Sequence, residues 1–393
     1  MNELFTDIGY NSLIKDGEEV CGDRVEVAGD GEKSTVVVLA DGLGSGVKAC
    51  ILSTLTAKML STMLADGMSV EESVRTIAQT LPVCSERGLA YSTFTAVRVE
   101  NNRTVEIVNY DNPMPIVLRG GQAYDYPVSM FHVEEKEITR THFTLQDGDT
   151  LVLLSDGVQH AGVPHGGASY KLGWGRDNIV SFLEIFAQTG FNAKTLTTVL
   201  LGEVYERYTA QPGDDSTVCT ISLRRRRQVN LMIGPPANRE DEHKMMSLFF
   251  SKQGKTIVCG GTTSKIVAAY LDKPYRPGPP SDDPDVPACG EIEGVDLVTE
   301  GVLTINRVLQ YAQDFLRDND TYTQWGYKKD GASRIARMLF EEATDINFFV
   351  GRAMNPAHED PDMPIHFSIK MRLIEDLAEA LRKMGKQIKV SYF

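Results

Sequence analysis

The stretch Val36-Val-Val-Leu-Ala-Asp41-Gly-Leu-Gly-Ser-Gly46 decides the fold of the first half of the chain. An apolar run ends in an aspartate, alternating glycines follow, and an apolar pattern at helical spacing begins directly afterwards. This pattern predicts a buried strand that delivers Asp41 to its end, then a tight turn and a helix. A carboxylate at a strand end, beside exposed backbone oxygens, is a typical ligand arrangement for a hard cation.

The same pattern recurs along the chain, and the repetition carries more weight than any single instance. Each instance alone is also what a strand-to-helix turn of an ordinary α/β domain looks like. Aspartates at predicted strand edges occur at four sites: Gly22-Asp23, Asp41-Gly42, Asp156-Gly157 and Asp214-Asp215. Together they predict oxygen ligands that converge on metal ions.

In this order, the four sites resemble the motifs of metal-dependent serine/threonine protein phosphatases of type 2C. The Asp-Gly-Leu-Gly-Ser-Gly form is similar to that of the bacterial SpoIIE/RsbU branch. So is the segment 109–115, Asn-Tyr-Asp-Asn-Pro-Met-Pro, although Tyr110-Asp111 stands where that branch usually has Gly-His. Asn112 before a proline is also typical of a turn. The resemblance covers residues 1–223 and implies an α+β fold, a two-sheet β-sandwich flanked by helices.

The resemblance also implies a chemistry, in which two Mn²⁺ or Mg²⁺ ions share a water that attacks the phosphorus of phosphoserine or phosphothreonine. Asp41, the bridging ligand, would act with Asp156 and Asp214 as the catalytic aspartates. The ligands would be Asp41, Asp156 and Asp214 for one ion, and Asp23, Asp41 and the backbone carbonyl of Gly42 for the other. Asp215 is the alternative to Asp214 as a ligand, or a support for its loop.

Two positions depart from the eukaryotic branch of that family. Leu43 stands where it has a histidine, and Glu19 stands where it has an arginine before the first aspartate. The proton for the leaving group and the anchor for the phosphate would then come from Arg24, His160, His165 or metal-bound water. The glycine-rich segment 160–167 is predicted to be a mobile flap over the site.

The length of 393 residues suits two domains. In the first, periodicity predicts helices and strands, and Asn101-Asn102 predicts a hairpin turn. The helices are expected over 47–64, 69–81, 177–188 and 193–208, and the strands over 91–100, 104–109, 114–119 and 150–154. Helices on either side of a block of strands indicate sheets packed face to face between helical layers.

The sequence pattern changes around Arg224–Val229. Beyond this point strands alternate with helices, which predicts a smaller second α/β domain with a mostly parallel sheet. The domains are therefore expected at residues 1–227 and 228–393, the second with a regulatory or partner-binding role. Its segment 260–264, Gly-Gly-Thr-Thr-Ser, lies between a strand and a helix. That is suited either to plain helix capping or to binding a small anionic ligand.

Charge and composition exclude several classes of function. The formal net charge of -14 argues against nucleic acid or an anionic membrane as the main partner. The six cysteines contain no Cys-x-x-Cys pair, so neither a zinc site nor a disulfide framework is expected. No uninterrupted apolar run reaches the roughly 18 residues that cross a membrane. A cytoplasmic location is the default expectation.

The sequence therefore predicts a metal-dependent serine/threonine phosphatase acting on a phosphorylated regulatory protein, such as an anti-sigma-factor antagonist. Two alternatives remain open at this point. One is a catalytically silent phosphatase-like scaffold that senses a small ligand through its second domain. The other is a metallohydrolase of a small phosphoester.

Overall fold

The computed structural model describes most of the chain. The chain divides into two compact units, Met1–Arg225 and Arg226–Phe393. The division falls inside the arginine run Arg224–Arg227, where the sequence pattern changes. The described residues are 3–29, 33–80, 92–133, 136–163, 173–279, 287–317, 319, 322–353 and 369–393.

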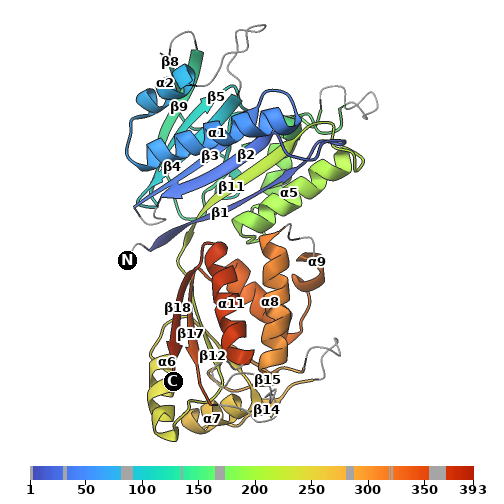
Figure 1. Ribbon diagram of the computed structural model, residues 1–393. Helices are drawn as coiled ribbons and strands as arrows, with labels where there is room; N and C mark the ends of the chain where they lie inside the picture. The colour runs from blue at the N-terminus through green and yellow to red at the C-terminus, as the bar shows by residue number, and fades with distance from the viewer. Residues whose placement is uncertain are drawn as a thin grey trace. The chain divides into compact units, whose positions relative to one another are not determined.

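Unit 1 contains two β-sheets (Figure 1). The first has the strand order β2-β3-β4-β5-β9-β8 and the second the order β1-β11-β10-β6-β7. The strand pairings within both sheets are antiparallel. The first sheet consists of β2 (Asp23–Gly29), β3 (Ser34–Gly42), β4 (Ser92–Glu100), β5 (Thr104–Tyr110), β9 (Lys136–Thr144) and β8 (Ser129–Val133). The second consists of β1 (Leu4–Leu13), β11 (Ser216–Arg225), β10 (Thr150–Leu154), β6 (Ile116–Arg119) and β7 (Gln122–Ala123).

Helices cover the outer face of each sheet. They are α1 (Gly46–Ala65) and α2 (Val70–Thr80) on the first sheet, and α4 (Arg176–Phe186) and α5 (Ala193–Arg207) on the second, with the short α3 (Asp156–Gln159) after β10. Side chains of both sheets, such as Leu39 and Leu153, share one buried cluster. Separate clusters join α1 and α2 to the first sheet and α4 and α5 to the second. The expected two-sheet sandwich flanked by helices is thus confirmed.

Alternation of apolar side chains explains the layers. Along β3, Val36, Val38 and Ala40 pack toward the helices, whereas Val37 and Leu39 pack between the sheets. Because successive side chains point to opposite faces, a strand buried on both faces is apolar throughout. The uninterrupted run before Asp41 is therefore a central strand of the sandwich.

Helix α1 is the single described helix that is long and apolar enough, by length and composition, to cross a membrane. In the structure it lies along β2, β3 and β4, and Ala49, Leu52 and Leu60 are buried. Its apolar character is therefore accounted for, on that side, by the sheet that it covers.

Helix α2 begins within one residue of the predicted range 69–81, and Ser69 caps it. The Ser69 hydroxyl accepts the backbone N–H of Glu72 at 3.3 Å and donates to the Glu72 carboxylate at 2.7 Å. The first bond satisfies a backbone N–H that a helix start would leave unpaired, and the second joins the two side chains.

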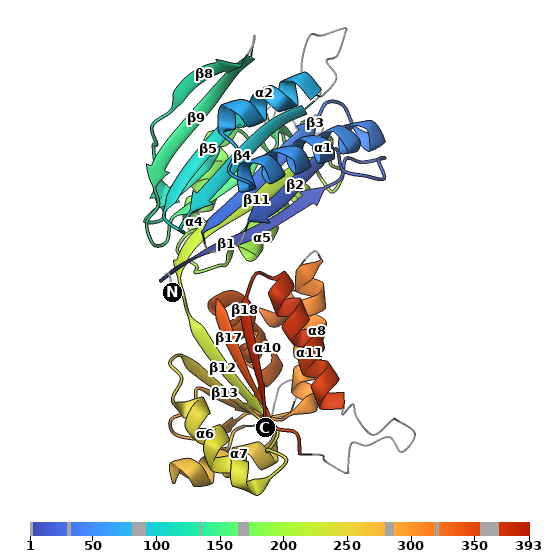
Figure 2. The same ribbon diagram turned by 60° about the vertical axis from the view of Figure 1, so that its left-hand side comes forward.

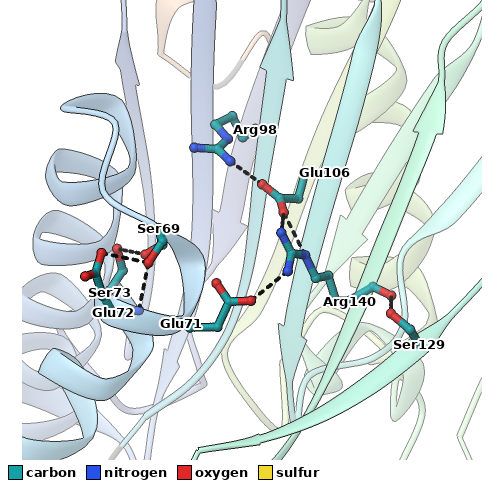
Figure 3. Close-up of polar contacts among 8 residues, drawn as sticks. All are labelled: Ser69, Glu71, Glu72, Ser73, Arg98, Glu106, Ser129 and Arg140. Atoms are coloured by element: carbon teal, nitrogen blue, oxygen red, sulfur yellow. Dashed lines mark hydrogen bonds and ion pairs between the residues drawn. The ribbon is translucent and has the colours of Figure 1, made fainter.

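A chain of ion pairs then ties α2 to the first sheet (Figure 3). Arg140 on β9 contacts Glu71 of α2 at 2.7 Å and the buried Glu106 of β5 at 2.5 Å. Glu106 also accepts from Arg98 of β4 at 2.5 Å. The helix α2 and the strands β4, β5 and β9 are therefore joined at one place.

The predicted hairpin at Asn101-Asn102 is confirmed. Both residues have positive φ, 52° and 50°, and they join the antiparallel strands β4 and β5. Asparagine tolerates this left-handed conformation better than most residues. Strands β8 and β9, by contrast, were missed by the sequence analysis; β8 is largely exposed and lies at the sheet edge.

Unit 2 contains a mixed sheet in the order β14-β15-β16-β13-β12-β17-β18 (Figure 2). The five neighbouring strands β16, β13, β12, β17 and β18 are parallel, which confirms the predicted α/β pattern. Strands β14 and β15 extend the sheet in antiparallel pairings. The strands are β12 (Gln228–Ile233), β13 (Lys255–Cys259), β14 (Arg276–Pro277), β15 (Gly290–Glu291), β16 (Leu297–Thr299), β17 (Asp345–Val350) and β18 (Gln387–Tyr392).

The helices of unit 2 lie on both faces of this sheet (Figures 1 and 2). They are α6 (Glu242–Phe250), α7 (Gly261–Leu271), α8 (Val302–Leu316), α9 (Tyr322–Trp325), α10 (Gly331–Ala336) and α11 (Ile369–Lys383). Helices α6 and α7 share a buried cluster with Met232 and Phe349, while α8 and α11 pack against each other. The sheet is therefore covered by helices on both sides, as parallel sheets usually are.

Candidate metal centre

Two of the predicted ligands lie on neighbouring strands of the first sheet. Asp23 opens β2 and is the direct antiparallel partner of Asp41 near the end of β3. One residue further, the Gly42 N–H donates to the carbonyl of Gly22 at 3.2 Å. Both carboxylates thus start from directly opposed positions, where side chains of paired residues are neighbours.

Gly42 has a packing reason to be glycine. A Cβ at this position would lie 2.1 Å from the carbonyl oxygen of Ala49 in α1. The missing side chain lets the first turns of α1 approach the end of β3. Gly44 and Gly46 have positive φ, 99° and 70°, so the turn itself also requires glycine.

The other two sites come from the second sheet. Asp156 follows β10 as the first residue of α3, and Asp214 precedes β11. Ser155 fixes these two strand ends together, because its backbone N–H donates to the Thr217 carbonyl at 3.0 Å and its hydroxyl accepts the Thr217 N–H at 2.8 Å. A Cβ on Gly157 would lie 2.1 Å from the carbonyl oxygen of Asp215, so this contact also depends on glycine.

Asp215 supports the loop that leads to Asp23. One carboxylate oxygen accepts the backbone N–H of Lys15 at 3.0 Å and the other accepts that of Gly22 at 2.9 Å. The residue is buried. With both oxygens engaged by backbone donors, Asp215 suits the supporting role better than that of a ligand, and Asp214 remains as the candidate ligand.

The aspartates interact electrostatically across the two sheets. Burial raises the pKa of Asp41 to about 9, and the charges of Asp23, Asp156 and Asp214 add to this effect. Burial likewise raises the pKa of Asp23 to about 7, against hydrogen bonds from Ser155 and Thr217 that favour its charged form. Such a group of acids is costly without positive charge nearby.

Burial also raises the pKa of Asp214, and the charge of Asp156 is the next largest cause. One oxygen of Asp23, Oδ2, is buried without a hydrogen-bond partner. An orphaned carboxylate oxygen among acids fits a divalent cation, which supplies the missing charge and takes oxygen ligands.

The aspartate side chains of this site do not surround a single ion position. Across the described part of the chain, no group of three or more His, Cys, Asp or Glu side chains is placed to hold a metal. The acids are near enough to raise one another's pKa, yet they do not converge on one point. Bound cations would relieve the mutual repulsion of these like charges.

The sequence analysis named Arg24, His160 and His165 as candidates for the proton donor or the phosphate anchor, and their positions in the structure differ. Arg24 follows Asp23 on β2, so its side chain projects from the opposite face; it pairs with Glu26 at 2.8 Å and is not placed as a phosphate anchor. His160 is exposed directly after α3, close in sequence to Asp156. His165, and with it the second half of the expected flap, residues 164–167, lies outside the described residues.

Asn112 proves to be part of a buried polar network rather than a plain turn residue. Its side-chain oxygen accepts from the Thr93 hydroxyl, and its amide donates to the Thr95 hydroxyl at 3.3 Å. Asn109 donates to the Asn112 carbonyl at 2.8 Å. The network braces β4 and β5 beside Asp41, and Asp111 has the positive φ of a turn residue, 58°.

Sequence reasoning missed several residues that hold the acids in place. Ser92 donates to the backbone carbonyl of Asp41 at 2.9 Å, and Tyr208 donates to that of Gly157 at 2.8 Å. Ser155 and Thr217 act on Asp23, as described above. Ser155 and Thr217 lie within a few residues of the motif aspartates, and this proximity could have identified them from the sequence. The sequence around Ser92 and Tyr208 contains no such signal.

Comparisons with known proteins agree on the nature of this unit. Residues 31–224 match the family model of stage II sporulation protein E, SpoIIE. The stage II sporulation protein E of Bacillus subtilis (strain 168) is 24% identical over 156 residues, which are 38% of this chain and 18% of that protein. The chain thus matches less than a fifth of the length of this curated relative.

Two solved structures are also similar. The phosphatase domain of the cell fate determinant SpoIIE from Bacillus subtilis aligns with 57% of this chain and 95% of its own, at 20% identity and a TM-score of 0.43. The catalytic domain of the serine threonine protein phosphatase PstP, in complex with two manganese ions, aligns with 56% of this chain and 99% of its own, at 18% identity and a TM-score of 0.39.

The family match begins just before β3 and ends in β11, so it spans three of the four aspartate sites. The first site, Asp23, lies outside the matched range but is the register partner of Asp41. Residues 31–224, just under half of this chain, are therefore similar to the SpoIIE family.

Proposed function

We propose that this chain is a metal-dependent protein serine/threonine phosphatase that hydrolyses phosphoserine or phosphothreonine on a regulatory protein. The observation that carries the proposal is the electrostatic interaction of Asp23 and Asp41, register partners in one sheet, with Asp156 and Asp214 at the strand ends of the other. The match to the SpoIIE family supports the same class of reaction.

Two Mn²⁺ or Mg²⁺ ions, when bound, would supply an acidified water and neutralise the charge of the phosphoryl group. Asp41 would be shared between them, with Asp156 and Asp214 on one side and Asp23 and the Gly42 carbonyl on the other. Hydrogen bonds from Ser155 and Thr217 favour the charged form of Asp23, against the effect of its burial. Asp215 keeps the 15–22 loop in place, so Asp23 stays opposite Asp41.

The leaving serine or threonine oxygen needs a proton. His160, exposed at the end of α3, is the described candidate nearest in sequence to the acids, and water is the alternative. The proposed substrate is a phosphorylated regulatory protein of the anti-sigma-factor antagonist type, and the proposed location is the cytoplasm. Unit 2 would regulate the phosphatase or recruit its partner.

The test compares three substrates, a phosphoserine protein, a phosphoserine peptide and a small aryl phosphate, each with Mn²⁺, with Mg²⁺ and with a chelator. We expect turnover of the phosphoprotein that requires the cation and is lost in Asp41→Asn. Exclusive turnover of small phosphoesters would favour a metallohydrolase of small molecules instead. No turnover of any substrate in folded, cation-loaded protein would favour a silent scaffold.

A further inference from the structure

The candidate metal centre carries an excess of negative charge that a phosphate group would meet. Five aspartates interact there: Asp23, Asp41, Asp156, Asp214 and Asp215. Two divalent cations would bring four positive charges, so the site would stay negative with all five carboxylates ionised. A phosphoserine carries about two negative charges near neutral pH. A further positive charge beside the aspartates would therefore favour its binding.

Lys15 supplies a positive charge at this place. Strand β1 pairs with β11, with Leu13 opposite Ser216. Continued by two residues, this register sets Lys15 opposite Asp214, and opposed residues of antiparallel strands direct their side chains to the same face. Burial raises the pKa of Asp214 and the charge of Asp156 adds to the effect, whereas the charge of Lys15 lowers it. The ammonium of Lys15 thus acts on the aspartate site.

The backbone of Lys15 is held in place by three hydrogen bonds. Its N–H donates to the Asp215 carboxylate at 3.0 Å, and its carbonyl accepts the N–H of Glu18 at 3.0 Å. The N–H of the next residue, Asp16, donates to the carbonyl of Pro212 at 2.8 Å. These contacts fix the point from which the side chain starts, and they do not engage its ammonium.

The ammonium of Lys15 is available to a ligand. The residue is partly exposed and forms no ion pair with the described part of the chain. Glu18, in the same loop, already accepts from the Ser45 hydroxyl at 2.7 Å. Arg24 differs from Lys15 in both respects, because it projects from the other face of β2 and pairs with Glu26 at 2.8 Å. Lys15 is therefore the better placed of the two cations.

We propose that Lys15 binds the phosphate group of the phosphoserine or phosphothreonine substrate through its ammonium, beside Asp214. The inference rests on the proposed phosphatase function and adds a substrate-binding residue to it. A lysine ammonium is a compact point charge on a flexible stem, which suits a phosphate oxygen. Lys15 would hold inorganic phosphate, the product, in the same way, so its role can be measured without turnover.

The first test titrates inorganic phosphate into the full chain loaded with Mg²⁺ and follows the heat of binding. Thermal unfolding is measured in parallel, with sodium chloride of equal ionic strength as the salt control. We expect the parent to bind phosphate, Lys15→Met to bind it about ten- to a hundredfold more weakly, and Lys15→Arg to retain part of the affinity. Lys15→Met keeps the backbone N–H that donates to Asp215, so its Tm in chelator should stay near that of the parent.

The matched control is Lys58→Met. Lys58 is exposed, lies three turns along α1 from Gly46, and pairs with Glu26 at 3.5 Å. This variant should bind phosphate as the parent does.

The second test measures turnover of a phosphoserine peptide with Mn²⁺. Lys15→Met should raise KM by about the same factor as it weakens phosphate binding, and the rise of Tm that Mn²⁺ gives should not become smaller. A lysine that only balanced Asp214 or supported the loop would change Tm or the response to Mn²⁺ and leave KM and phosphate affinity unchanged.

The outcomes separate this inference from the proposed function. If the parent hydrolyses the peptide and Lys15→Met has the KM and phosphate affinity of the parent, the inference is wrong and the phosphatase function stands. If the parent binds phosphate through Lys15 and hydrolyses no substrate, the phosphate site stands and the proposed function fails. A parent that binds no phosphate, or a Lys15→Arg variant that binds as weakly as Lys15→Met, also overturns the inference.

Discussion

Asp41 is the residue on which the aspartate cluster depends, because its pKa is raised by burial and by four other aspartates. Asp41→Asn removes an acid whose charged form is costly at this buried position, with almost no change of volume. We expect the variant to lose Mn²⁺-dependent turnover and the rise of Tm that Mn²⁺ gives the parent, and to unfold at a higher Tm than the parent in chelator. Scanning calorimetry with and without Mn²⁺ checks the binding result independently of activity.

A second prediction at this scale separates two adjacent aspartates. Asp214→Asn should lose the cation response and keep the fold. Asp215→Asn should lower the free energy of unfolding by about 1–3 kcal/mol, because an amide cannot accept from both Lys15 and Gly22. Chemical denaturation in chelator measures the difference, and equal stabilities of the two variants would contradict the assigned roles.

The sequence alone identified the aspartates but not the division of work between them. The motif positions follow from strand ends and glycines, which are local features. The role of Asp215 depends on donors at Lys15 and Gly22, about two hundred residues away, and no local pattern reports such a contact. Arg24 was misjudged for a simpler reason, since alternation along β2 turns it away from Asp23.

At the scale of elements, the attachment of α2 to its sheet gives a further prediction. Arg140→Met should lower the free energy of unfolding by about 1–2 kcal/mol, because the buried Glu106 loses one of its two arginines and Glu71 loses its partner. Backbone amides of α2 should exchange hydrogen faster as the helix loosens.

The matched control is Lys383→Met, which breaks the exposed i,i+4 pair with Glu379 on α11. Exposed pairs of this kind contribute little. If both variants are as stable as the parent, the network in Figure 3 is a surface feature without weight in folding.

Helices with strong periodicity were predicted nearly to their ends. The expected 69–81 is observed as Val70–Thr80, and 193–208 as Ala193–Arg207. Strands β8 and β9 were not predicted, since exposed edge residues show little apolar alternation. The strand order of unit 2 was also beyond the sequence, because parallel pairing is decided by packing between distant segments.

For the whole molecule, we predict that residues 1–227 fold without the rest of the chain. The buried clusters of the two sheets lie entirely within unit 1. The first and last strands of unit 1, β1 and β11, pair with each other. The fragment should unfold cooperatively and hydrolyse an aryl phosphate with Mn²⁺. Circular dichroism and a turnover assay test it, and an unfolded fragment under every condition would show that the units depend on each other.

The pairing of β1 with β11 joins residues 4–13 to residues 216–225, the two ends of unit 1. On the ribosome, Asp23 and Asp41 are made early, but Asp214 and the strand that follows it arrive last. At typical rates of synthesis the wait is on the order of ten to forty seconds. A nascent chain that stops short of β11 has neither a closed second sheet nor a complete set of acids. Any chain that carries the assembled site has therefore been translated through the whole of its phosphatase unit.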